Sequence, residues 1–160
     1  MTFILTDERD DDPEGSFDRY REYLERERHR FPPSAHALAT SGWYYGTEHH
    51  GAPHDAWLEA LEITEPSSGA RHEERVVTMK VRLLGAYHDG IIEMRYPLVF
   101  GYRLDFFPGP GSHGDWRYDE FEVNRAGRLI HTIEWFGAGE SGAWRIEASD
   151  VEHKWTPFER

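Results

Sequence analysis

The feature of this chain that most constrains its fold is a long series of strand-like segments between Ala56 and Val151. Apolar and polar residues alternate along these segments, as on strands with one buried face. The links between them are short, and Asp89-Gly90 is the strongest hairpin signal because this pair favours a two-residue type I′ turn. Short links join antiparallel neighbours, whereas parallel pairing needs crossovers of about a dozen residues or more. The series therefore predicts an antiparallel sheet.

One amphipathic helix is expected in front of the strands, from Ser16 to His29. Phe17, Tyr20 and Leu24 fall on one side of this helix and polar residues fall on the other. A second, short helix is expected after Pro33. A one-sided apolar stripe needs a surface to pack on, and we expect the sheet to provide it.

These elements predict the α+β class, with an N-terminal helix packed on a strongly twisted antiparallel sheet. We expect about six to seven meandering strands. A sheet with this number of strands can also curl into a partly closed barrel, which is the alternative. The turn-forming residues from Pro108 to Gly111 mark one break between strands. We expect one domain over residues 1–160, with residues 1–15 as a flexible acidic segment, because runs of like charge are usually solvated.

Charge limits the partners that this chain can have. The sequence contains 30 acidic and 18 basic residues, for a formal net charge of −12. A field of this sign repels phosphate backbones and anionic membrane surfaces, because both need Lys and Arg to neutralise them. We therefore expect neither a nucleic-acid partner nor a membrane partner. A basic protein or a small molecule is compatible with the charge.

The sequence contains no cysteine. Disulfides, thiolate catalysis and iron–sulfur ligation are therefore excluded. The first residues have no basic region, and their apolar stretch ends at Asp7, unlike a signal peptide or a membrane span. We therefore expect a cytoplasmic location.

A loop rich in histidine is the candidate metal site, with His49, His50 and His54 as ligands and Asp55 as a fourth. Neutral imidazoles bind Zn²⁺, Ni²⁺ and Cu²⁺. In a loop, however, this spacing does not impose a coordination geometry as it would on a helix, so a solvated polar loop is the simpler interpretation. No other cofactor is indicated.

Two neighbouring strand segments mix aromatic and ionisable residues. Trp116, Tyr118 and Glu120 share one face of the first segment, and His131 and Trp135 share one face of the next. On a concave sheet such residues can line a small-molecule pocket, in which Glu120 and His131 are the candidates for proton transfer. In the alternative interpretation the rings fill the edge of the core and the charges pair across strands.

The function that fits these observations best is that of a small acidic, non-catalytic binding protein. Such a protein would act as an inhibitor or immunity-type protein that neutralises a basic protein partner, since complementary potentials speed encounter and fix register. The sequence contains no nucleophile elbow, phosphate loop, dinucleotide fingerprint or zinc signature. Two alternatives stay open, a small-molecule pocket or enzyme within a curved sheet and a metal site at the His cluster.

Overall fold

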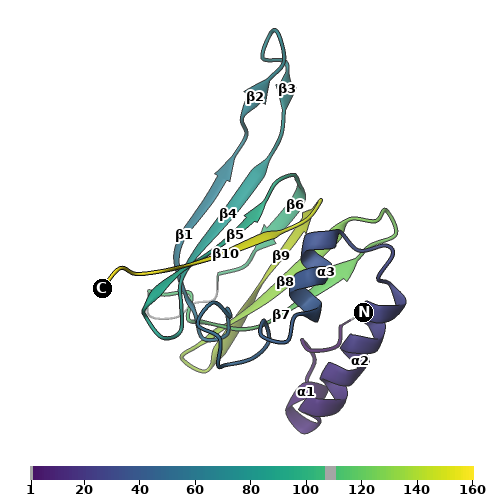
Figure 1. The fold of residues 1–160 in the computed structure, drawn as a ribbon, viewed down its shortest axis with the longest axis vertical. Coiled ribbons are helices and arrows are strands. Elements are labelled where there is room, and N and C mark those ends of the chain that lie inside the picture. The colour runs from purple at the N-terminus through teal and green to yellow at the C-terminus, as the bar shows by residue number, and fades with distance from the viewer. Residues whose placement is uncertain (1, 107–110) are drawn as a thin grey trace.

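The computed structural model describes residues 2–106 and 111–160, so the expected break at Pro108 lies outside the described residues. In these two ranges three helices precede ten strands, which confirms the α+β class (Figure 1). The helices are α1 (Glu8–Asp11), α2 (Pro13–Arg26) and α3 (Pro33–Thr40). The strands are β1 (Trp57–Thr64), β2 (Ser67–Ser68), β3 (Glu74–Arg75), β4 (Thr78–Leu84), β5 (Gly90–Tyr96), β6 (Val99–Leu104), β7 (Asp115–Val123), β8 (Leu129–Gly137), β9 (Glu140–Ala148) and β10 (Glu152–Pro157).

Eight of these strands form one antiparallel sheet in the order β10-β5-β4-β1-β7-β8-β9-β6. A single residue pair, Trp57 with Asp115, joins β1 to β7, so the sheet consists of two four-stranded halves. The edge strands β10 and β6 do not pair with each other within the described ranges. The sheet therefore stays open, and the alternative of a barrel is not realised.

The chain passes between the two halves twice. Only Pro97 and Leu98 separate β5 from β6, yet β6 pairs with β9 in the other half. The residues from Ser149 to Val151 then lead back from β9 to β10, which pairs with β5. Pro97 suits the first crossing because it has no N–H to give to a ladder. The two crossings touch, since the N–H of Ser149 donates to the carbonyl of Leu98 at 2.8 Å.

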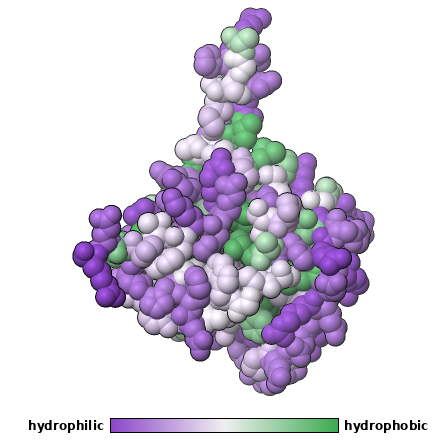
Figure 2. All heavy atoms as spheres, in the orientation of Figure 1, coloured by the Kyte–Doolittle hydropathy of each residue, from purple (hydrophilic) through white to green (hydrophobic). Residues whose placement is uncertain are grey.

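The two halves share one hydrophobic core. Met79, Val81 and Leu83 of β4 are buried because the polar residues between them point outward. Ile133 and Trp135 of β8 contribute from the second half. From α2, the buried side chains are Tyr20 and Leu24. Figure 2 shows mainly hydrophilic residues on the visible face, with the arm that ends in β2 and β3 projecting from it.

Helix α2 begins at Pro13, three residues before the expected start at Ser16, because the carboxylate of Asp12 accepts the N–H of Gly15 at 3.0 Å. The preceding segment, for which flexibility is expected, lies against the sheet in the structure, with Ile4 fully buried. None of the helices in the described ranges is long and apolar enough to cross a membrane.

The hairpin between β4 and β5 is present, but its turn differs from the expected one. Asp89-Gly90 does not form a two-residue turn, since Gly90 already belongs to β5. The residue with a left-handed backbone is instead His88, at a φ of 57°. Gly90 is needed for a different reason, because the ring of Trp155 lies directly against it. Strand β10, which contains Trp155 and ends at a proline, was not predicted from the sequence.

Candidate functional site

A carboxylate in the core, Asp119 of β7, gathers a network of buried polar groups. Its Oδ2 accepts a hydrogen bond from the Tyr44 hydroxyl at 2.7 Å and lies 2.7 Å from Nε2 of His131. Its Oδ1 accepts the indole N–H of Trp116 at 3.1 Å. The other nitrogen of His131, Nδ1, lies 2.6 Å from the hydroxyl of Tyr96. All five side chains are at most 2% exposed, so the network is sealed from solvent.

A β-bulge explains how this network forms. The register of β7 against β8 shifts between Trp116 and Tyr118, which places Trp116 and Asp119 on the same side of the strand. In a regular strand two residues three positions apart would point to opposite faces. Burial also raises the pKa of Tyr44 and of Tyr96 well above the ordinary value, and for Tyr44 the charge of Asp119 adds to this effect. Both phenols therefore keep their protons, and Tyr44 donates a hydrogen bond to the carboxylate of Asp119.

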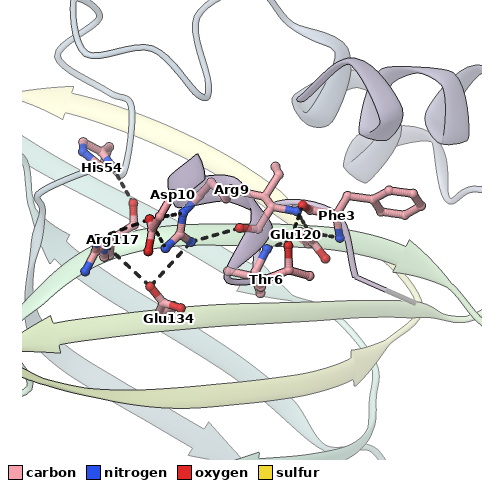
Figure 3. A network of polar contacts seen from close by, with 10 residues as sticks. Phe3, Thr6, Arg9, Asp10, His54, Arg117, Glu120 and Glu134 are labelled. Carbon is pink, nitrogen blue, oxygen red and sulfur yellow. Dashed lines mark hydrogen bonds and ion pairs between the residues drawn. The ribbon is translucent and has the colours of Figure 1, made fainter. Parts of the chain in front are cut away.

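Glu120 points to the other face of β7, where it holds the N-terminal segment (Figure 3). Its Oε1 accepts the backbone N–H of Phe3 at 2.6 Å and that of Leu5 at 3.0 Å, and the N–H of Ile4 between them donates to the same oxygen. The other oxygen, Oε2, is buried without a partner in the part of the chain that the structure describes. Burial raises the pKa of Glu120.

Arg9 fastens the same segment from inside. Its Nη1 donates to the carbonyl of Ile4 at 2.9 Å and lies 3.7 Å from Oε1 of Glu134 (Figure 3). The carbon of its guanidinium lies 4.2 Å from the centre of the Tyr118 ring. Because this one base turns inward, the exposed charged side chains of residues 7–14 are all carboxylates. We call this surface the acidic ridge; its exposed members are Asp7, Glu8, Asp10, Asp11, Asp12 and Glu14.

The structure does not bring the five residues of the predicted pocket together around one cavity. Trp116, His131 and Trp135 lie in the core, where the Trp116 and Trp135 rings are 5.6 Å apart. Tyr118 and Glu120 lie on the opposite face under the N-terminal segment. The sheet thus separates the two groups, and in this arrangement the indoles fill the core. Ligand binding by this set stays a prediction.

The three histidines of the predicted metal site have separate partners. Nδ1 of His50 lies 2.5 Å from Oδ2 of Asp89, and His49 packs its ring on Trp43. Nδ1 of His54 forms a hydrogen bond with the backbone carbonyl of Arg117 in β7. Across residues 2–106 and 111–160, no group of three or more His, Asp or Glu is arranged to hold a metal ion.

A cleft between α2, α3 and the following loop was not predicted from the sequence. It has a volume of about 550 Å³, and Arg21 and Glu25 contribute polar groups to it. The apolar part of its lining comes from Phe17, Tyr20, Leu24, Ala39 and Tyr45. The signal that could have found it is the position of Phe17 at the exposed border of the apolar stripe of α2.

Other residues of these networks were also missed. Asp119 stood in a strand pattern without an obvious partner, and Tyr44 and Tyr96 are far from it in the sequence. Arg9 lies within an acidic run. A single base in such a run is the signal that could have indicated a side chain turned toward the protein. Comparison with known protein families, curated proteins and solved structures finds no match.

Proposed function

We propose that this chain is a non-catalytic binding protein of the inhibitor or immunity type, which neutralises a basic protein partner. The observation that carries this proposal is the acidic ridge. Six carboxylates are exposed there between residues 7 and 14, and the one base of this stretch, Arg9, is turned into the protein. Arg19 of α2 pairs with Glu8 and Asp12, and Asp10 lies within 4.0 Å of Arg9 and Arg117. Asp7, Asp11 and Glu14 have no ion pair in the part of the chain that the structure describes, so these three carboxylates present unpaired negative charge to a partner.

The ridge is held in a fixed place, which distinguishes it from a loose acidic tail. Glu120 binds the backbone before it, and Arg9 binds the sheet beneath it. A preordered surface loses less conformational freedom when it binds than a disordered one. Negative potential on such a surface speeds the encounter with a basic partner.

The interior supports a non-catalytic role for the two residues that were candidates for proton transfer. His131 is fully buried and has partners at both ring nitrogens. Glu120 is fully buried and receives three backbone N–H groups. Both side chains hold parts of the fold together, and neither faces solvent.

The experiment is capture of the partner with matched variants. The purified chain is immobilised and exposed at low salt to soluble extract from the cells that produce it. We expect one basic protein to be retained, and to be released as salt screens the attraction. The triple variant Asp7→Asn, Asp11→Asn, Glu14→Gln should lose this protein. A control variant removes the same charge at scattered exposed positions: Glu22→Gln, Glu59→Gln and Glu140→Gln.

Capture is then tested by reconstitution. The purified partner and the purified chain should form a complex of fixed stoichiometry in which the activity of the partner is suppressed. Equal retention by the ridge variant and the control variant would contradict the proposal. Substrate turnover by the purified chain without any partner would contradict it as well.

The cleft supports a second candidate function, small-molecule binding. Its volume of about 550 Å³ lies in the usual range of ligand sites, roughly 300–1,000 Å³, and its lining includes three aromatic rings, those of Phe17, Tyr20 and Tyr45. Ligand-observed NMR with a panel of neutral aromatic compounds tests it, with Phe17→Ala as the variant. Binding that is lost in Phe17→Ala supports this function. A panel without binders, or binders unaffected by the variant, speaks against it.

A further inference from the structure

Three large aromatic rings surround the turn between β4 and β5, and all three are exposed. The exposed fractions of Trp57, Tyr87 and Phe158 are 49%, 52% and 51%, although large aromatic side chains are usually buried in the core or in interfaces. Trp57 packs its ring 4.5 Å from that of His88 in the turn. The backbone N–H of Phe158 donates to the carbonyl of Asp89 at 2.8 Å. We call the surface formed by Trp57, Tyr87 and Phe158 the aromatic face.

Two of these rings are held in place by hydrogen bonds. The indole N–H of Trp57 donates to Oδ1 of Asp115 at 2.8 Å. The hydroxyl of Tyr87 donates to the carbonyl of Thr47 at 2.7 Å, and its ring stacks on His50 with 4.1 Å between the ring centres. A ring that is already fixed has little freedom to lose when a partner covers it.

The surroundings of the aromatic face are acidic. Asp115 is bonded to Trp57, Asp89 lies in the turn, and Asp55 is exposed two residues before Trp57. The sequence has no Lys or Arg at positions 31–70, 83–94 or 104–116, and these ranges include Trp57, the turn and Asp115. The bases near Phe158 along the chain are Lys154, within β10, and Arg160, beyond the end of that strand.

We infer that the aromatic face binds an arginine-bearing loop of the basic protein partner. This inference rests on the proposed function and identifies the surface at which that partner is bound. A guanidinium stacks on aromatic rings and hydrogen-bonds carboxylates, and here the exposed ring of Trp57 lies beside the carboxylate of Asp115. Trp, Tyr and Arg also dominate the energetic centres of protein interfaces. Phosphate groups and anionic lipids meet carboxylates here and are repelled.

The test is an NMR titration of the full-length ¹⁵N-labelled chain at low salt with a nona-arginine peptide. The indole N–H of Trp57, assigned with Trp57→Phe, and the amides of residues 85–90 should shift. Trp57→Ala should weaken binding about tenfold, as expected for loss of a cation–π contact. Asp115→Asn should also weaken it, whereas Phe100→Ala, which removes an exposed ring on β6, should leave it unchanged. The five other indole signals report that each variant keeps its fold.

The outcomes separate this inference from the proposed function. Shifts confined to the acidic ridge, with Trp57 unaffected, would overturn the inference and leave a basic partner in place. Absence of binding at both surfaces would overturn both. Equal binding of a nona-glutamate peptide would show that charge plays no part and would also overturn both.

Discussion

Nε2 of His131 lies 2.7 Å from Oδ2 of Asp119, and both side chains are almost fully withdrawn from solvent. A buried carboxylate is costly unless it is paired and hydrogen-bonded, and here Tyr44 and Trp116 supply the further donors. Tyr96 extends the network from His131 into β5. The network therefore joins the loop after α3 to both halves of the sheet.

Removal of the central carboxylate should cost more than removal of any one donor. Asp119→Ala leaves three buried polar partners unpaired, and we expect a loss of about 3–5 kcal/mol in the free energy of unfolding. Tyr44→Phe removes one of the donors to Asp119, with an expected loss of about 1–3 kcal/mol. Urea unfolding measures both. A smaller loss for Asp119→Ala than for Tyr44→Phe would show that the network is not centred on Asp119.

Arg9 should be required for the order of the N-terminal segment. Arg9→Met keeps much of the side-chain volume but removes the bond to Ile4 and the charge over Tyr118, so we expect a loss of about 1–3 kcal/mol. Amide hydrogen exchange at residues 3–8 should become faster. Arg19→Met is the matched control, because Arg19 is half exposed and its ion pairs should contribute less than about 1 kcal/mol. Identical exchange in both variants would exclude this role of Arg9.

Glu120 should make stability depend on pH in a defined direction. Burial raises its pKa in the folded state, so the folded state binds a proton more readily than the unfolded state does. The stability linked to this group is therefore present at acid pH and is lost as the pH rises through the raised pKa.

The variant Glu120→Gln cannot ionise and escapes this loss. Between about pH 4 and about pH 7, the difference in the free energy of unfolding should move in favour of the variant as the pH rises. Urea unfolding at several pH values measures this difference. Glu152→Gln, at an exposed ion pair with Arg95, is the control and should show little change. A shift in favour of the wild-type protein would refute the expectation.

Gly90 should not tolerate a side chain. A Cβ atom there would lie 2.3 Å from the ring of Trp155 and 2.6 Å from the carbonyl oxygen of Thr156. Gly90→Ala should therefore cost about 1–3 kcal/mol, as overpacking usually does. Gly101 has no atom within 4 Å of the equivalent position, so Gly101→Ala should be neutral or slightly stabilising. Equal melting temperatures for the two variants would contradict this packing.

The antiparallel sheet and the main helix could be predicted because their signals are local. Alternation along β4 and the apolar stripe of α2 depend on neighbouring residues only. The Asp119 network could not be predicted, because a bulge changes the face on which Trp116 lies. Tyr44 is also 75 residues from Asp119 in the sequence, and Tyr96 is 35 residues from its partner His131.

The positions of the candidate site residues in the fold could not be predicted from the sequence for a similar reason. The residue types identified Glu120 and His131 as polar groups within strands. They did not show that the two side chains lie on opposite faces of the sheet. Arg9 lies in a run of acids that suggests a solvated tail. Contacts with residues far along the chain, among them Tyr118, 109 positions after Arg9, show that this run is anchored.

The order of the strands has a consequence for synthesis on the ribosome. The half made of β1, β4 and β5 lacks its edge strand until β10, near the end of the chain, has been made. Until then the apolar strand β5, with Ile92 and Met94, presents an unpaired backbone edge that other chains can join. Helix α2 also lacks part of its packing surface until β7 has been made, since the hydroxyl of Tyr20 donates to the carbonyl of Phe121, 101 residues later. The nascent protein thus depends on β10, which is made after β6 to β9, for protection of β5 against aggregation.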